Sequence, residues 1–226
     1  IDVLRRFDFG LAYRQDRYVF QATDDFTLGL PDYNENWVFA RVEFVHDNTI
    51  QLGQNLPSGI RFRAYAEIHK QFFIEDQNLF NSVEIPLPNF NDAYFGVFGF
   101  DFRYYQKIHR NLIWANRIAY GTSWGNNKLI YYLGGIDGWI GAQFNQETQI
   151  AQDQDYAFQT IAVNMRGFQQ NIRNGSSFAL YNSEIRWPIF DYLIRGPIRS
   201  EFIRSFQVIG FTDIGTAWEG PSPYSD

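Results

Sequence analysis

The residue pattern that most constrains the fold is an alternation of apolar and charged side chains with a period of two. Between Ile60 and Lys70 one set of alternate residues is apolar and the other is polar or charged, and residues 3–14, 37–47 and 93–106 alternate similarly. Because successive side chains of a β-strand point to opposite faces, each segment predicts a strand with one apolar and one polar face. The expected strands, about eight in all, cover residues 3–13, 17–28, 37–47, 59–70, 93–106, 111–121, 176–187 and 204–218.

The expected strands are long, and their apolar faces are rich in aromatic residues. Several run to about ten residues or more, the length that a strand needs to cross a membrane, whereas strands of soluble proteins are mostly about five or six residues long. Phe, Tyr and Trp make up 19% of the chain, although its mean hydropathy is only −0.34. These features favour an antiparallel transmembrane β-barrel with lipid outside and a wet lumen inside. The alternative is a soluble β-sandwich whose apolar faces form the core.

In the barrel interpretation, the two faces of each strand point to lipid and to the lumen. The predicted lipid-facing residues are the aromatic ones at Phe62, Phe98, Phe100 and Phe102. The predicted lumen-facing residues are the charged ones at Arg61, Arg63, Glu67, Asp101 and Arg103. This assignment follows the alternation of apolar-out and polar-in residues that is typical of outer-membrane strands.

Short and long connections alternate along the chain. Residues 107–110 predict a tight turn, whereas residues 71–92 and 122–175 predict long loops, and such asymmetry is typical of outer-membrane barrels. All 8 prolines lie outside the expected strands, since proline cannot donate a ladder hydrogen bond. The stretch 122–175 is too long for an idle loop in a compact fold, so it is either external and mobile or folded back into the barrel and functional. No stretch predicts a strong helix.

Composition excludes several classes of function. No run of about 18 apolar residues predicts a transmembrane helix. The 19 Lys and Arg against 25 Asp and Glu leave a net charge of −6, so we expect no nucleic-acid partner. The chain has no Cys, and its 3 His lack metal-ligand spacing, so we expect no metal, no cofactor and no enzymatic activity. Because the sequence begins with Ile1 rather than Met and nothing near it resembles a signal peptide, we expect an internal part of a larger protein.

Three short motifs follow one another near the C-terminus. Residues 165–168 (Met-Arg-Gly-Phe) end the long loop, residues 184–188 (Glu-Ile-Arg-Trp-Pro) end the next expected strand, and residues 211–215 (Phe-Thr-Asp-Ile-Gly) lie in the last one. The alternation places Glu184 and Asp213 on the inner side of neighbouring strands. An arginine in a loop that folds inward can bind both carboxylates.

These motifs resemble the BamA-type superfamily, the bacterial surface antigen family of outer-membrane assembly and translocation barrels. Its mark is an Arg-Gly-Phe/Tyr tip on a long loop inside the barrel, followed by strands with Glu-x-x-x-Pro and Phe-x-Asp-x-Gly. The stretch 47–59 is also similar to the family's strand–turn pattern. The resemblance implies that Arg166 contacts Glu184 and Asp213 while Phe211 packs beside it. We call the residues of this predicted contact the latch: Arg166, Gly167, Phe168, Glu184, Phe211 and Asp213.

One feature departs from the family pattern. The family often has a Gly-Gly pair a few residues before the Arg-Gly motif, whereas here Gly134-Gly135 lies far upstream, with a polar run between. Either the loop carries an insertion, or residues 137–139 (Asp-Gly-Trp) form a second, unrelated turn.

The resemblance also implies a function and a location. Residues 1–226 are expected to be an internal part of one barrel domain in the bacterial outer membrane, contributing about eight strands of about sixteen, with residues 122–175 inserted into the lumen. The implied activity is the insertion or translocation of proteins without ATP. Implied partners are the lipid bilayer, unfolded outer-membrane or secreted client proteins, and accessory subunits. The alternative is a passive diffusion pore or a structural outer-membrane barrel.

Overall fold

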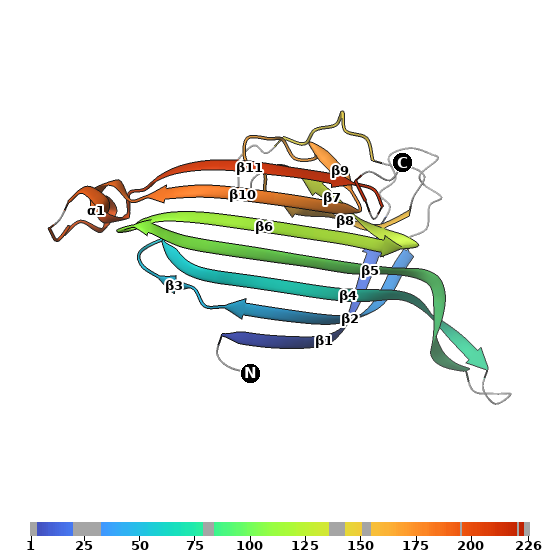
Figure 1. The fold of residues 1–226 in the computed structure, drawn as a ribbon. Helices are drawn as coiled ribbons and strands as arrows, with labels where there is room; N and C mark the ends of the chain where they lie inside the picture. The colour runs from blue at the N-terminus through green and yellow to red at the C-terminus, as the bar shows by residue number, and fades with distance from the viewer. Residues whose placement is uncertain are drawn as a thin grey trace.

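The computed structural model describes residues 4–19, 33–78, 84–135, 143–150, 155–194, 196–220 and 222–223. It consists mostly of antiparallel β-strands, with two short helices (Figure 1). The all-β, antiparallel class predicted from the residue alternation is therefore confirmed. The strands are β1 (Arg5–Tyr18), β2 (Tyr33–Asp47), β3 (Ile50–Gln51), β4 (Pro57–Asn78), β5 (Glu84–His109), β6 (Leu112–Gly125), β7 (Asn127–Leu133), β8 (Asp155–Val163), β9 (Arg173–Gly175), β10 (Ser177–Trp187) and β11 (Val208–Trp218).

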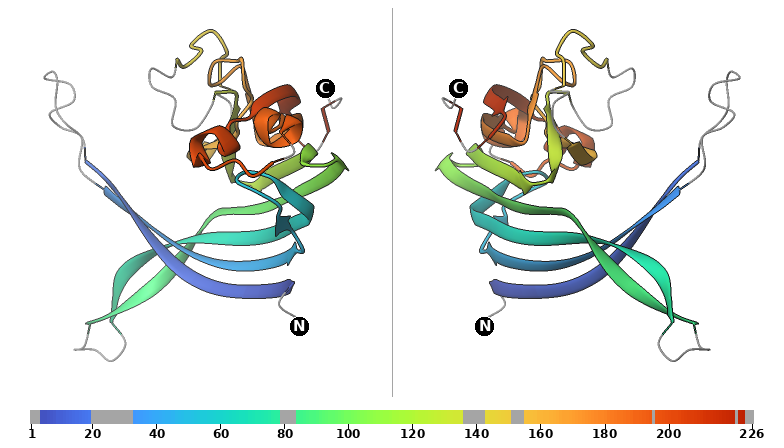
Figure 2. Two further views of the ribbon diagram at one scale, coloured as in Figure 1. Left: turned by 90° about the vertical axis from the view of Figure 1, so that its left-hand side faces the viewer. Right: turned by 90° about the vertical axis from the view of Figure 1, so that its right-hand side faces the viewer.

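The large sheet has the order β1-β2-β4-β5-β6-β10-β11, and β3 pairs with the start of β4. Neighbouring strands of this order run antiparallel. The sheet twists and bends strongly, as the right-handed twist of its strands dictates (Figure 2). Within the described ranges it is open, with β1 and β11 at its edges. A second, small sheet has the order β8-β7-β9.

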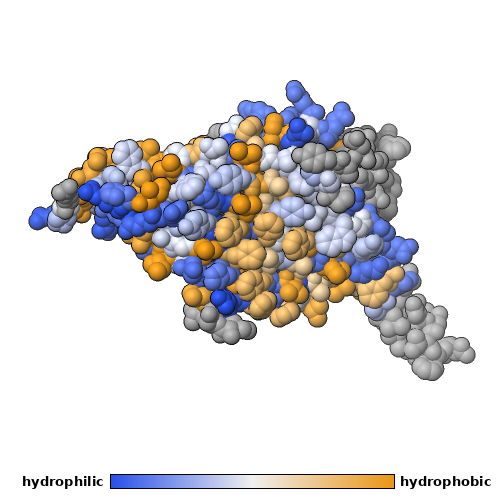
Figure 3. Space-filling view, viewed as in Figure 1, coloured by the Kyte–Doolittle hydropathy of each residue, from blue (hydrophilic) through white to orange (hydrophobic). Residues whose placement is uncertain are grey.

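One face of the large sheet, which we call the outer face, is apolar. The strand register places one uncharged row across all its long strands: Phe7, Phe44, Ala64, Phe100, Tyr120, Ala179 and Thr216. Many of the large apolar side chains on this face are exposed, up to 83% for Leu11. Figure 3 views this side and shows apolar residues gathered over the middle of the sheet. Such an extensive exposed apolar surface is typical of a lipid or protein contact.

The opposite, inner face carries most of the charged residues of the long strands and, toward one end, the small sheet. The buried core lies between the large sheet and the segment that joins β6 to β10. The large sheet contributes Trp37, Phe95, Val97, Phe178 and Leu180. The segment contributes Leu129, Tyr131, Leu133 and Met165. Aromatic rings join the layers, since the Tyr131 and Phe178 ring centroids are 5.0 Å apart. The described parts of residues 127–175, which we call the covering segment, therefore fold against the inner face.

Two strand predictions need correction. The expected strand 17–28 is wrong at its start, because Arg17 and Tyr18 continue β1 and pair with Asn34 and Tyr33 of β2. Most of its remainder lies outside the described residues. The predicted loop 71–92 is also wrong, because β4 and β5 extend through Asn78 and from Glu84 as one long hairpin.

Prolines explain why this hairpin was missed. Pro86 and Pro88 lie inside β5, but this part of the strand pairs only with β4. A proline is tolerated where one edge of the strand has no partner to receive its missing N–H. The tight turn predicted at residues 107–110 lies slightly further along the chain in the structure. β5 continues to His109, and the turn is formed by Arg110 and Asn111.

The predicted loop 122–175 contains ordered β structure. It begins inside β6 and includes β7, β8 and β9, which form the small sheet. We expected no strands within this stretch, because strands as short as β7 and β9 give no long alternation. Residues 137–139 lie outside the described ranges.

Two short helices, α1 (Ile189–Leu193) and α2 (Glu201–Ser205), lie between β10 and β11. The Ser200 side chain caps α2 by accepting a hydrogen bond from the Ile203 N–H. No helix was expected, because five residues are too few to show a helical period. Among the helices in the described ranges, none has the length and apolarity needed to cross a membrane.

The close approach of β9 to β11 predicts a packing defect in one variant. A Cβ atom at Gly175 would overlap backbone atoms of Trp218. Gly175→Ala should therefore destabilise the fold by about 1–3 kcal/mol, because backbone cannot rotate away as a side chain can. The midpoint of urea unfolding measures this effect. Gly210→Ala on β11 is the matched control, since its Cβ meets open space. An equal fall of both midpoints would contradict the explanation.

Candidate functional site

Arg166 lies between two carboxylates on neighbouring strands. Its Nε and Nη2 donate hydrogen bonds to Asp213 Oδ2 and Oδ1 at 2.9 and 2.7 Å, and its Nη1 donates to Glu184 Oε1 at 2.5 Å. The Arg166 backbone N–H also donates to Asp213 Oδ2, at 2.9 Å. The pairing of Arg166 with Glu184 and Asp213 is thus present as the sequence predicts. A bidentate guanidinium–carboxylate contact fixes orientation as well as distance.

Burial strengthens this contact. The Asp213 side chain is 1% exposed, that of Glu184 17% and that of Arg166 22%. The hydrogen bonds from Arg166 to Asp213 raise the pKa of the guanidinium above its usual value. Removing one partner of such a contact leaves another charge poorly compensated.

Phe211 completes the arrangement. The Arg166 guanidinium carbon lies 4.1 Å from the centroid of the Phe211 ring, a cation–π contact. Strand register explains the convergence, because Glu184 pairs directly with Phe211, and Asn182 with Asp213. Glu184, Phe211 and Asp213 therefore lie on the same face of β10 and β11, where Arg166 contacts all three.

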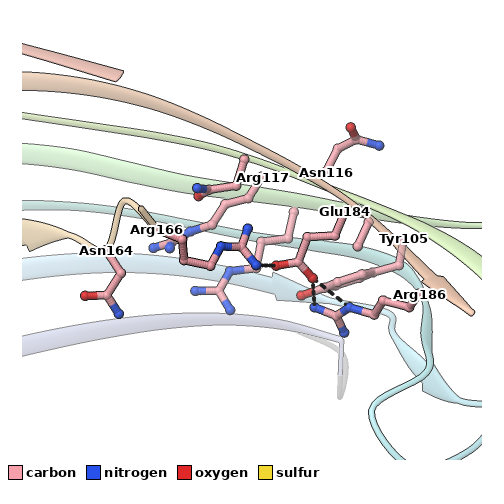
Figure 4. A pocket seen from close by; sticks show the side chains of 10 residues that line it. Tyr105, Asn116, Arg117, Asn164, Arg166, Glu184 and Arg186 are labelled. Atoms are coloured by element: carbon pink, nitrogen blue, oxygen red, sulfur yellow. Dashed lines mark hydrogen bonds and ion pairs between the residues drawn. The ribbon is translucent and has the colours of Figure 1, made fainter. Parts of the chain in front are cut away.

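The Arg166 site opens into a pocket of about 240 Å³ on the inner face (Figure 4). Arg186 also binds Glu184, with Nε 2.8 Å from Oε2, so this carboxylate bridges two arginines. Arg186 Nη1 also donates a hydrogen bond to the backbone oxygen of Asn55, at 3.1 Å. Asn116 points away from this group in Figure 4 and accepts a hydrogen bond from Tyr181 on the outer face.

Glycines allow the chain to place Arg166 at this point. Gly167 follows it with φ of +85°, a conformation that favours glycine. Gly135 forms a β-bridge with Met165, and its N–H donates to the Phe168 carbonyl at 3.0 Å. The Gly-Gly pair thus lies beside the Arg-Gly motif in space although it is distant in sequence. Among the predicted latch residues, the side chains of Phe168 and Phe211 remain exposed.

The predicted lumen-facing residues share the inner face with Glu184 and Asp213. Ion pairs link them to neighbouring residues: Arg63 Nε lies 2.8 Å from Glu43 Oε1, and Arg41 Nη1 lies 2.7 Å from Glu67 Oε1. Asp101 bridges Arg103 and Arg117. Arg61 pairs with Asp47 at 3.1 Å. The predicted lipid-facing residues lie on the opposite, outer face: Phe62, Phe98, Phe100 and Phe102.

Sequence reasoning missed several residues of the site. Arg117 could have been found, because it faces Arg103 on one side and Asn182 on the other once the strands are in register. The contact of Asn55 with Arg186 had no signal, since it joins segments far apart in the chain. The position of Gly135 was likewise decided by folding of the segment between β7 and β10.

Comparisons with known proteins leave the family open. A scan against protein-family models gives no match to this chain, and a search of curated proteins gives none. In the described part of the chain, no cluster of three or more His, Asp or Glu side chains is placed to hold a metal ion.

The geometry predicts unequal roles for the two carboxylates. Asp213→Asn should destabilise the fold more than Glu184→Gln, because Asp213 is the more buried and accepts three hydrogen bonds from Arg166. Breaking a buried pair costs about 3–5 kcal/mol, and a solvated pair about 1 kcal/mol or less. Urea unfolding and protease cleavage of residues 127–175 measure the effect. Glu201→Gln, at an exposed pair, serves as the control. The reverse order of midpoints would refute this ranking.

Proposed function

We propose that this chain is part of an outer-membrane β-barrel similar to the BamA-type superfamily, which inserts or translocates proteins without ATP. The observation that carries the proposal is the contact of Arg166 with Glu184 and Asp213, which joins a folded-back segment to the inner face of a long-stranded sheet. The order of the three motifs and the geometry of this contact match what the resemblance implies.

The outer face supports a location in lipid. It combines exposed aromatic and aliphatic residues with an uncharged row across the sheet. Polar side chains on this face pair with one another: Trp114 Nε1 donates to Ser183 Oγ at 2.9 Å, and the Tyr181 hydroxyl donates to Asn116 Oδ1 at 2.7 Å. Polar groups that face hydrocarbon need such internal partners, because lipid offers none.

The inner face favours an assembly role over a passive pore. The described parts of residues 127–175 cover part of this face through a buried core and the Arg166 contact, whereas a pore needs only an open lumen with charged constrictions. Strand addition at a sheet edge requires no nucleotide, since backbone hydrogen bonds and burial of apolar side chains in lipid supply the driving free energy. The latch would keep the covering segment in place while client strands are added.

Adjacent residues of β1 provide a test for the membrane location. Leu11→Arg should impair assembly into lipid, because an arginine facing the bilayer centre costs about 2–4 kcal/mol, whereas a change at an exposed site in water costs about 0.5 kcal/mol or less. Ala12→Arg is the matched control, since Ala12 is exposed on the inner face. Heat-modifiable gel mobility after folding into vesicles measures assembly. Equal assembly of both variants would favour the soluble β-sandwich.

The proposed activity is tested with the full-length protein in lipid vesicles. An unfolded outer-membrane barrel is added as client, and its folding is followed by gel mobility without ATP. Client folding should be faster than in empty vesicles, and Arg166→Ala should lose much of this acceleration. Size-selective solute flux with no acceleration would instead support a diffusion pore.

A further inference from the structure

The connection between β10 and β11, residues 188–207, exposes an unusual number of apolar side chains. They lie in and around α1 and α2, and Phe202 and Leu193 are 79% and 61% exposed. The exposed set consists of Phe190, Leu193, Ile194, Phe202, Ile203 and Phe206. Figure 3 shows apolar residues over this connection as well as over the middle of the sheet. A connection that merely reverses the chain in water has no need of this surface.

Several polar side chains of the connection face the turn at residues 52–56. Asp191, Glu201, Arg204, Ser205 and Gln207 line a pocket of about 380 Å³ together with the turn at residues 52–56. That turn also binds Arg186 of the inner face. None of the six apolar residues lines this pocket. The connection is therefore amphipathic, with its polar side turned toward the 52–56 turn.

The apolar side of the connection continues the outer face of the sheet. Trp187 and Val208 are paired outer-face residues that flank it, and both are partly exposed. The Phe190 and Phe206 ring centroids lie 5.5 Å apart, which closes the connection into one apolar surface. Trp114 lies on the outer face at the same end of the sheet. Tryptophans are enriched at membrane–water interfaces, where their rings are partly apolar and partly wet.

Charge at this end of the sheet suits lipid headgroups. Among the described residues of the connection and the β5–β6 turn, the exposed cationic ones are Lys107, Arg110, Arg199 and Arg204, and the acidic ones are Asp191 and Glu201. Arg110 also stacks on Tyr192 and donates to its backbone oxygen, which holds the β5–β6 turn against α1. Basic residues beside exposed Phe and Leu are the pattern of an amphipathic segment in the plane of a membrane interface.

We propose that residues 188–207 form an interfacial anchor, with Phe202, Leu193 and their apolar neighbours inserted at the headgroup–acyl boundary of the adjacent leaflet. This inference rests on the proposed membrane location and adds a specific lipid contact to it. Segments of this kind reach about 5–10 Å into the boundary. The anchor fixes the depth of the sheet end that also carries the 52–56 turn and Arg186.

The absence of Cys from the sequence makes single-cysteine labelling a clean test. Phe202→Cys, Ile118→Cys on the outer face and Gln54→Cys in the inner turn each carry an environment-sensitive fluorophore in the full-length protein. The proteins are folded into phosphatidylcholine–phosphatidylglycerol vesicles with a nitroxide quencher near the headgroups or deep in the acyl chains. Ile203→Cys replaces Phe202→Cys if gel mobility shows that the latter does not fold.

The anchor predicts a pattern of quenching. The probe at residue 202 should be quenched more by the shallow nitroxide than by the deep one, the probe at 118 should be quenched, and the probe at 54 should not. Quenching at 118 with none at 202 would overturn the anchor and leave the membrane location intact. No quenching at either residue would reject the membrane location itself.

Discussion

The contact of one guanidinium with two carboxylates ties the two layers of this structure together. Asp213 and Glu184 belong to the last two strands of the large sheet, and Arg166 belongs to the segment that folds over it. The apolar core around Met165 and Phe178 and a hydrogen bond from the Leu129 N–H to Ser123 Oγ also hold this segment in place. Because apolar packing is non-directional, the charge pair supplies the orientation that packing alone lacks.

The two faces of the sheet divide the chemistry of the chain. The inner face gathers ion pairs that cross neighbouring strands, while the outer face is apolar and pairs its few polar groups among themselves. In water the exposed rings of the outer face would promote aggregation, whereas in lipid they are in a favourable apolar environment. The proposed membrane location thus accounts for both faces at once.

The inner site also links the covering segment to the turn at residues 52–56. Glu184 binds Arg166 of the covering segment on one side and Arg186 on the other, and Arg186 reaches the turn at Asn55. One carboxylate thus lies between the covering segment and the arginine that binds the 52–56 turn. This turn lies beside the connection that carries the proposed lipid anchor.

The sequence by itself determined most long strands of the large sheet and their two faces, because a period of two assigns every second residue of β4, β5, β10 and β11 to one face. The partners of Arg166 followed from the resemblance of its three motifs to a known family. It did not determine the small sheet within residues 127–175, the long β4–β5 hairpin or the place of Gly135. Those depend on contacts between residues far apart in the chain, which leave no local period. Tertiary structure alone brought Gly135 beside Phe168 and Asn55 beside Arg186, since both approaches arise only when the segments fold against the inner face.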